Sequence, residues 1–159
     1  MSVYINSFLR KEDGTLVSIQ SWEGPIRDPE YLEGALELTV NEVPLITPSM
    51  WDYIDELWAY ILNSLEELTS EKSTHTYFPD QPIKLEMKRL APGWIQVSIS
   101  SRSGKFDNST QVQENQFYQI LIDKGEEFFL RMRELTPGGR DQYETEIEKC
   151  KALRADCSK

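Results

Sequence analysis

The chain has 159 residues, of which 39% are hydrophobic and 28% are charged. These values are typical of one globular domain and exclude a disordered chain. No apolar run approaches the roughly 20 residues that a membrane helix requires. The first ten residues also lack the basic start and apolar stretch of a secretory signal. We therefore expect one domain over residues 1–159, located in the cytoplasm and not bound to a membrane.

The net charge of −10 is distributed unevenly along the chain. Residues 1–80 hold 15 acidic against four basic residues, a net charge of −11, whereas residues 81–159 carry +1. Such a field repels nucleic-acid backbones and attracts basic proteins. Solubility alone also explains a negative net charge. The asymmetry nevertheless favours a basic protein partner over a nucleic acid.

The first forty residues have the pattern of β-strands. Residues 3–9 and 16–21 are rich in β-branched and aromatic side chains, and they flank the turn Lys11–Gly14, which predicts a hairpin. Residues 24–29 contain glycine and proline and form a loop. Apolar and polar residues then alternate from 36 to 41, which indicates a strand with one solvated face.

A long amphipathic helix is predicted over residues 49–69. Thr47 and Pro48 supply a capping hydroxyl and a proline suited to a first helical position. Apolar residues then recur at spacings of three and four, which predicts a helix lying on a sheet. The stripe consists of Trp51, Ile54, Trp58, Ile61, Leu65 and Leu68.

A second hairpin follows this helix. Residues 83–88 and 95–100 alternate between apolar and polar side chains, and Ala91–Gly93 between them form a reversing turn. The polar stretch 101–111 leaves room for a short edge strand near Phe106.

The last third is predicted to be helical. Apolar periodicity favours a helix over Glu114–Leu135, because it continues past Gly125. A strand over Phe117–Ile122 is the alternative, since these six residues favour β-structure. A final helix over 140–155 has a thin apolar stripe, so we expect residues 140–159 to pack lightly and to end in a mobile tail.

The predicted order is therefore β-β-β-α-β-β-α-α. It contains hairpins and no alternation of long apolar strands with helices. This pattern predicts an α+β fold, with a mostly antiparallel sheet of about five strands and helices packed on one face.

The cysteines and the single histidine form no recognisable reactive site. On a helix, Cys150 and Cys157 lie about 10 Å apart, beyond the ~7 Å that a disulfide spans between Cα atoms. We expect free thiols, which suit a reducing compartment, although fraying of the last turn would permit a bridge. With His75 they match no zinc-ligand spacing. No nucleophile elbow or phosphate-binding glycine loop is present. We therefore expect no metal, no cofactor, no catalytic residue and no enzymatic activity.

Two segments are candidates for binding a partner. On the predicted helix, tyrosines and carboxylates face away from the apolar stripe, an arrangement that suits a protein-binding surface. These residues are Asp52, Tyr53, Glu56, Tyr60 and Glu66. Burial of the two rings against the sheet edge is the alternative. The proline-stiffened segment 77–82 presents Tyr77 and Asp80 to a partner, or inserts Phe78 into the core.

Two hypotheses about function follow from the sequence. The first is a non-enzymatic module that binds a basic protein, in the manner of an inhibitor or immunity protein. The alternative is a small-molecule-binding domain or enzyme, with a cavity between sheet and helices and with carboxylates such as Asp80. A homo-oligomer is also compatible with this composition.

Overall fold

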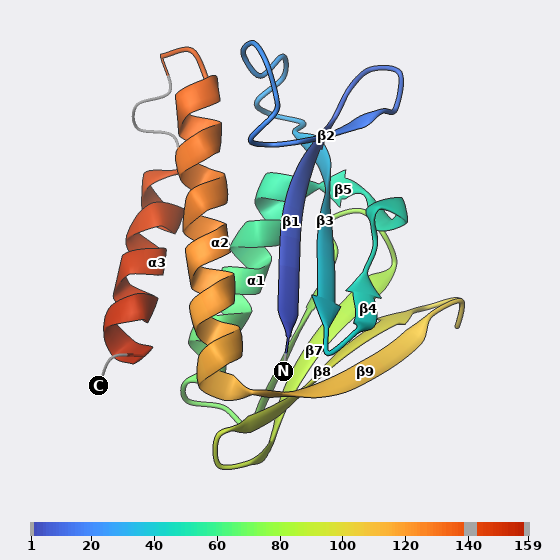
Figure 1. Ribbon diagram of the computed structural model, residues 1–159, viewed down its shortest axis with the longest axis vertical. Helices are drawn as coiled ribbons and strands as arrows, with labels where there is room; N and C mark the ends of the chain where they lie inside the picture. The colour runs from blue at the N-terminus through green and yellow to red at the C-terminus, as the bar shows by residue number, and fades with distance from the viewer. Residues whose placement is uncertain (1, 139–142, 158–159) are drawn as a thin grey trace.

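The computed structural model describes residues 2–138 and 143–157, and this part of the chain forms two antiparallel sheets and three α-helices (Figure 1). Sheet A has the order β2-β1-β3-β4, with β5 paired to the beginning of β3. Its strands are β1 (Val3–Arg10), β2 (Leu16–Ser18), β3 (Glu33–Val40), β4 (Val43–Ile46) and β5 (Asp52–Tyr53). Sheet B is a meander of β6 (Ser73–Tyr77), β7 (Ile83–Ala91), β8 (Trp94–Ser101) and β9 (Asp107–Gln113).

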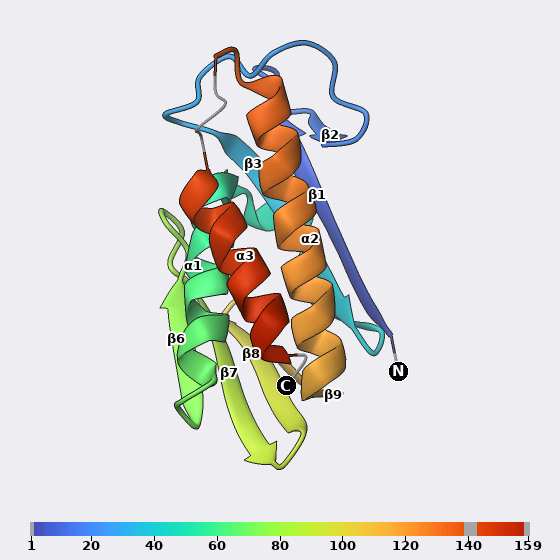
Figure 2. The ribbon, with the colours of Figure 1, turned by 90° about the vertical axis from the view of Figure 1, so that its left-hand side faces the viewer.

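The α+β class is confirmed, and the helices α1 (Ile54–Leu68), α2 (Glu114–Leu135) and α3 (Glu144–Cys157) lie on one side of the sheets (Figure 2). The strands form two sheets, where the sequence predicted one sheet of about five strands. Both predicted hairpins are present, and the edge strand expected near Phe106 is β9. The added strands β4, β5 and β6 are short, and Ser73–Tyr77 is mostly polar, so apolar alternation does not mark them.

Sheet A is built around β3, which pairs with β1 from Gly34 to Val40. At Gly34 a Cβ atom would lie 2.2 Å from the Phe8 carbonyl oxygen and 2.8 Å from the Ile54 side chain. Only glycine fits there, because both neighbours belong to packed structure. This close approach seats the beginning of α1 on sheet A.

Helix α1 begins five residues later than predicted. Pro48–Met50 form a single 3₁₀ turn, and the chain then extends through β5 before α1 begins. The pairing of β5 with β3 causes this difference, and the Ile54 amide donates to the Leu32 carbonyl at 3.0 Å. The predicted stripe is buried from Ile54 onward, whereas Trp51 lies outside the helix and is 37% exposed.

Helix α2 has the predicted bounds, and the alternative strand over Phe117–Ile122 is excluded because these residues are helical. Its Gly125 faces α1, where a Cβ atom would lie 3.2 Å from the ring of Trp58. That ring is fully buried, stacks on Phe128 at 6.2 Å and donates through Nε1 to the Ser7 hydroxyl at 3.0 Å. Gly125 thus allows α1 and α2 to approach each other closely.

Helix α3 covers α1 and α2 from outside (Figure 2). Its predicted beginning at residue 140 and the predicted tail at residues 158–159 lie outside the described residues. Arg154 contacts Asp123 at 3.0 Å and Glu126 at 3.1 Å on α2, and Tyr143 donates to Asp55 at 2.9 Å. Polar contacts therefore supplement the thin apolar stripe.

Candidate functional site

The structure separates the sequence-predicted binding residues into three places. Tyr53, Asp52 and Asp80 lie together at the end of sheet A where β5 pairs with β3. Glu56, Tyr60 and Glu66 lie along α1, and Tyr77 lies on β6.

Asp52 is not on an exposed helix face, so that prediction is wrong. Asp52 is only 3% exposed, and its carboxylate accepts hydrogen bonds from three backbone amides. Oδ2 accepts from Gln81 at 2.9 Å and from Asp80 at 3.1 Å, and Oδ1 accepts from Tyr53 at 2.7 Å. Asp52 therefore holds the turn after β6 against β5. It positions its neighbours and does not itself face solvent.

An exposed group of aromatic and acidic side chains surrounds this anchor. The pairing of β5 with β3 places Tyr53 opposite Glu33, and the rings of Tyr53 and Tyr31 lie 6.0 Å apart. We call Tyr31, Glu33, Trp51, Tyr53 and Asp80 the acidic aromatic patch. Tyr31 is 61% exposed and Trp51 is 37% exposed, so the patch presents aromatic surface to solvent.

The electrostatic potential of the patch is negative. Partial desolvation raises the pKa of the Tyr53 phenol, and the carboxylates of Asp80 and Glu33 raise it further. These carboxylates therefore act on the same point of the surface. A phenol held neutral among carboxylates remains a hydrogen-bond donor and acceptor at neutral pH.

The patch already holds one cation of the chain itself. The guanidinium of Arg10 lies over the Trp51 ring, 4.2 Å from its centroid, and 3.7 Å from the Glu33 carboxylate. Cation–π and ion-pair attraction act together in such an arrangement. Arg10 shows that the chemistry of this surface suits guanidinium groups.

The remaining predicted residues lie apart from the patch. Glu66 is 3.8 Å from Lys149 on α3, and Tyr60 is 37% exposed. Partial desolvation and then Asp55 and Asp52 raise the pKa of Glu56. Tyr77 is 50% exposed.

His75, which the sequence analysis considered only as a zinc ligand, lies on strand β6. It pairs with Glu86 of β7, and its ring packs edge-on against Tyr77 with centroids 5.8 Å apart. Phe78 is buried, as its predicted insertion into the core requires.

A cavity of about 810 Å³ adjoins the patch at the ends of β1 and β3. It lies between the β1–β2 turn and the loop that leads to β3, and not between sheet and helices. Its apolar lining is Leu9, Trp22, Ile26 and Leu32, and its polar lining is Arg10, Lys11, Glu12, Asp13, Arg27, Asp28, Tyr31 and Glu33. Tyr31 and Glu33 belong to both the cavity and the patch.

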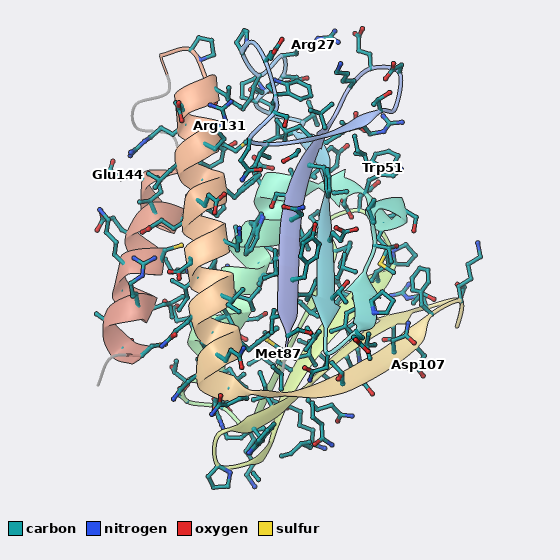
Figure 3. The ribbon with its side chains drawn as sticks, viewed as in Figure 1. Arg27, Trp51, Met87, Asp107, Arg131 and Glu144 are labelled. Carbon is teal, nitrogen blue, oxygen red and sulfur yellow. The ribbon has the colours of Figure 1, made fainter. Side chains whose placement is uncertain are left out.

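Helix α2 fixes the loop that forms one wall of this cavity. Arg131 donates through Nε to the Ile19 carbonyl at 2.9 Å and through a terminal nitrogen to the Trp22 carbonyl at 3.0 Å. The Ile26 amide donates to the Leu135 carbonyl at 3.0 Å. Figure 3 shows Arg131 on α2 beside the loops at the top, where Arg27 is labelled. Arg27 in turn forms an ion pair with Glu12 of the opposite wall.

Sequence reasoning missed three members of the patch. Tyr31 and Glu33 flank the beginning of β3, and nothing in their spacing reveals that β5 will pair there. Trp51 was assigned to the buried helical stripe because its spacing fits the stripe. The pair Tyr31 and Trp51 becomes visible only once the end of sheet A is assembled.

Three further features concern metal binding, membrane-spanning helices and the cysteine thiols. Within the described ranges, no three His, Cys, Asp or Glu residues are grouped to hold a metal ion. In the same ranges, no helix is long and apolar enough to cross a membrane. Both cysteines are free, and burial raises the pKa of the Cys150 thiol to about 12.

No family model matches the chain, and no curated protein or solved structure is significantly similar to it.

Proposed function

We propose that this chain is a non-enzymatic protein-binding module that engages a basic protein through the acidic aromatic patch, in the manner of an inhibitor or immunity protein. The observation that carries this proposal is the exposure of Tyr31 and Trp51 beside Glu33 and Asp80. Aromatic residues are enriched among the anchors of protein interfaces. The carboxylates around them select a positively charged surface.

The charge of the chain supports the same partner class. The segment 1–80, which contributes the whole patch, carries a net charge of −11. Complementary potentials accelerate association and disfavour partners of like charge. The stacking of Arg10 on Trp51, with Glu33 alongside, is an internal example of the contact that a partner's arginine would make.

The test is an affinity capture from the native host at low and at high salt, followed by mass spectrometry and by binding measurements with the retained protein. We expect one basic protein whose binding weakens steeply with salt. The informative charge reversals are Glu33→Lys and Asp80→Lys, because both side chains are accessible in the patch. Asp52 is unsuitable, since reversal of a buried carboxylate would disrupt folding.

Glu144→Lys is the matched control. It makes the same change of charge at the beginning of α3, and Figure 3 shows Glu144 on the opposite side of the molecule from Trp51. We expect this variant to bind like the wild type. Tyr31→Ala should weaken binding by roughly tenfold or more, as truncation of a hot-spot anchor does. Binding that does not depend on salt concentration would contradict the proposal. So would a Glu144→Lys variant that weakens binding as much as the patch variants do.

A further inference from the structure

The cavity next to the patch has the size and lining of a binding pocket. Its volume of about 810 Å³ falls within the roughly 300–1,000 Å³ that is usual for ligand pockets. Leu9, Ile26 and Leu32 are at most 6% exposed and give it an apolar lining. Trp22 lines it as well, and the indole Nε1–H of this residue is buried without an acceptor among the residues that the structure describes.

Among the polar side chains that line the cavity, acidic ones lie on the side that adjoins the patch. The lining holds the cations Arg10, Lys11 and Arg27 against the carboxylates Glu12, Asp13, Asp28 and Glu33, which leaves one negative charge in excess. Arg27 is paired with Glu12, and Arg10 contacts Trp51 and Glu33. Asp28 is exposed, and one of its carboxylate oxygens accepts the Glu30 amide at 3.2 Å. The carboxylates of the patch, Glu33 and Asp80, continue this negative potential beyond the cavity. A group entering from the patch therefore passes acidic side chains before it reaches the apolar lining.

We propose that this cavity receives an apolar, preferably aromatic, side chain of the protein partner, and that a basic residue adjacent to that side chain binds Asp28 and Glu33. This inference rests on the proposed function, and it names the partner segment that the site recognises. Interface anchors are typically large side chains inserted into desolvated pockets. The sharing of Tyr31 and Glu33 by cavity and patch makes one continuous surface for such a segment.

The walls of the cavity favour an anchor of this kind. Arg131 and the Ile26–Leu135 hydrogen bond hold the loop in place before any partner arrives, so little ordering is required on binding. The Glu12–Arg27 ion pair joins the two walls, and both side chains are more than 60% exposed. Ion pairs this exposed contribute little to stability, so a partner can displace the two side chains at small cost while the loop itself stays in place.

The first measurement uses a blocked dipeptide, N-acetyl-Phe-Arg-amide, as the probe and nuclear magnetic resonance of the indole N–H groups as the readout. The chain has four tryptophans and therefore four indole signals. The Trp22→Phe variant identifies the signal of Trp22. We expect the probe to shift that signal with a dissociation constant on the order of 1 mM. The Trp58 signal should stay in place, because its N–H is already bound to Ser7.

Matched probes and variants separate the two parts of the recognition. N-acetyl-Ala-Arg-amide lacks the apolar anchor and N-acetyl-Phe-Glu-amide reverses the flanking charge, and each should bind about tenfold more weakly or worse. The surface substitutions Asp28→Asn and Glu33→Gln should weaken binding of the Phe-Arg probe and strengthen binding of the Phe-Glu probe, because they remove carboxylates that attract arginine and repel glutamate. Thermal unfolding of each variant establishes that it folds.

Three outcomes would overturn the inference. One is the absence of any Trp22 shift at about 10 mM probe. Another is equal affinity for all three dipeptides, which would indicate non-specific adhesion. The third is binding of phenylalanine amide without arginine as tightly as the full probe, which would assign the cavity to small apolar molecules.

Failure here is distinguishable from failure of the proposed function. If a basic protein binds in a salt-sensitive manner, and if its binding is weakened by the patch variants but not by the cavity variants, only the cavity inference is refuted. Specific binding of the Phe-Arg probe, together with no basic protein captured, would refute only the proposed partner class.

Discussion

Replacement of Asp52 by asparagine tests the buried carboxylate that organises the candidate site. Asparagine has the same shape, but its amide nitrogen cannot accept the hydrogen bonds that one carboxylate oxygen now receives. In one orientation this nitrogen faces the amides of Gln81 and Asp80, and in the other it faces those of Tyr53 and Asp80. Hydrogen bonds to a buried charged group contribute about 1.5–3 kcal/mol. We therefore expect Asp52→Asn to lower the free energy of unfolding by about 2–3 kcal/mol.

Chemical denaturation and thermal unfolding measure this effect. For a chain of this size, a loss of about 2–3 kcal/mol lowers the melting temperature by roughly 5–10 °C. Asp80→Asn is the matched control, because it removes the same charge from an exposed side chain of the same turn. Its expected effect lies within about 0.5 kcal/mol. If the two variants are equally stable, Asp52 is an ordinary surface residue, and the placement of β5 beside the turn after β6 is wrong.

Three further predictions concern the helices. Gly125→Ala places a methyl group 3.2 Å from the Trp58 ring. The cost of overpacking, about 1–3 kcal/mol, exceeds the gain in helix propensity of about 1 kcal/mol, so we expect the melting temperature to fall. A rise in melting temperature would show that the ring can move. Burial raises the pKa of Asp55 above its ordinary value of 3.8. The stability that Asp55 contributes is therefore full below that value and declines as the pH rises through the raised pKa. Denaturation from about pH 3 to pH 7 should then show Asp55→Asn gaining stability relative to the wild type, and a constant difference would contradict this. Finally, Cys157 should react with an aromatic disulfide reagent at pH 8 before Cys150, whose pKa is raised to about 12; equal rates in the folded protein would refute the burial of Cys150.

The elements with strong periodicity were predictable from the sequence. The bounds of α2 agree with the prediction because its apolar residues recur across all 22 positions. The hairpin of β7 and β8 alternates over residues 83–88 and 95–100, on either side of a proline–glycine turn. In both cases one local pattern specifies the element, and no distant partner is required.

The elements created by distant pairing were not predictable. Asp52 and Tyr53 fit a helical face by spacing, yet pairing with Glu33 and Gly34 draws them into sheet A. The hydrogen bonds that β5 makes with β3 outweigh the weak local preference for a first helical turn. Tyr53 and Asp80 were identified as candidate residues, but their neighbours Tyr31 and Trp51 were not, because the sequence does not encode which exposed aromatics meet.

The anchoring of the cavity wall by α2 has a consequence for the order of events during protein synthesis. Arg131 follows Ile19 by 112 residues and Trp22 by 109 residues. At roughly 5–20 residues per second, about 5–20 s pass between the emergence of the wall and the emergence of its anchor. A nascent chain that ends before Arg131 can form the hairpin of β1 and β2 but cannot fix the loop beside it. The wall of the cavity is therefore fixed late in translation, long after the residues of the acidic aromatic patch have emerged, and a chain that ends before Arg131 lacks this fixed wall.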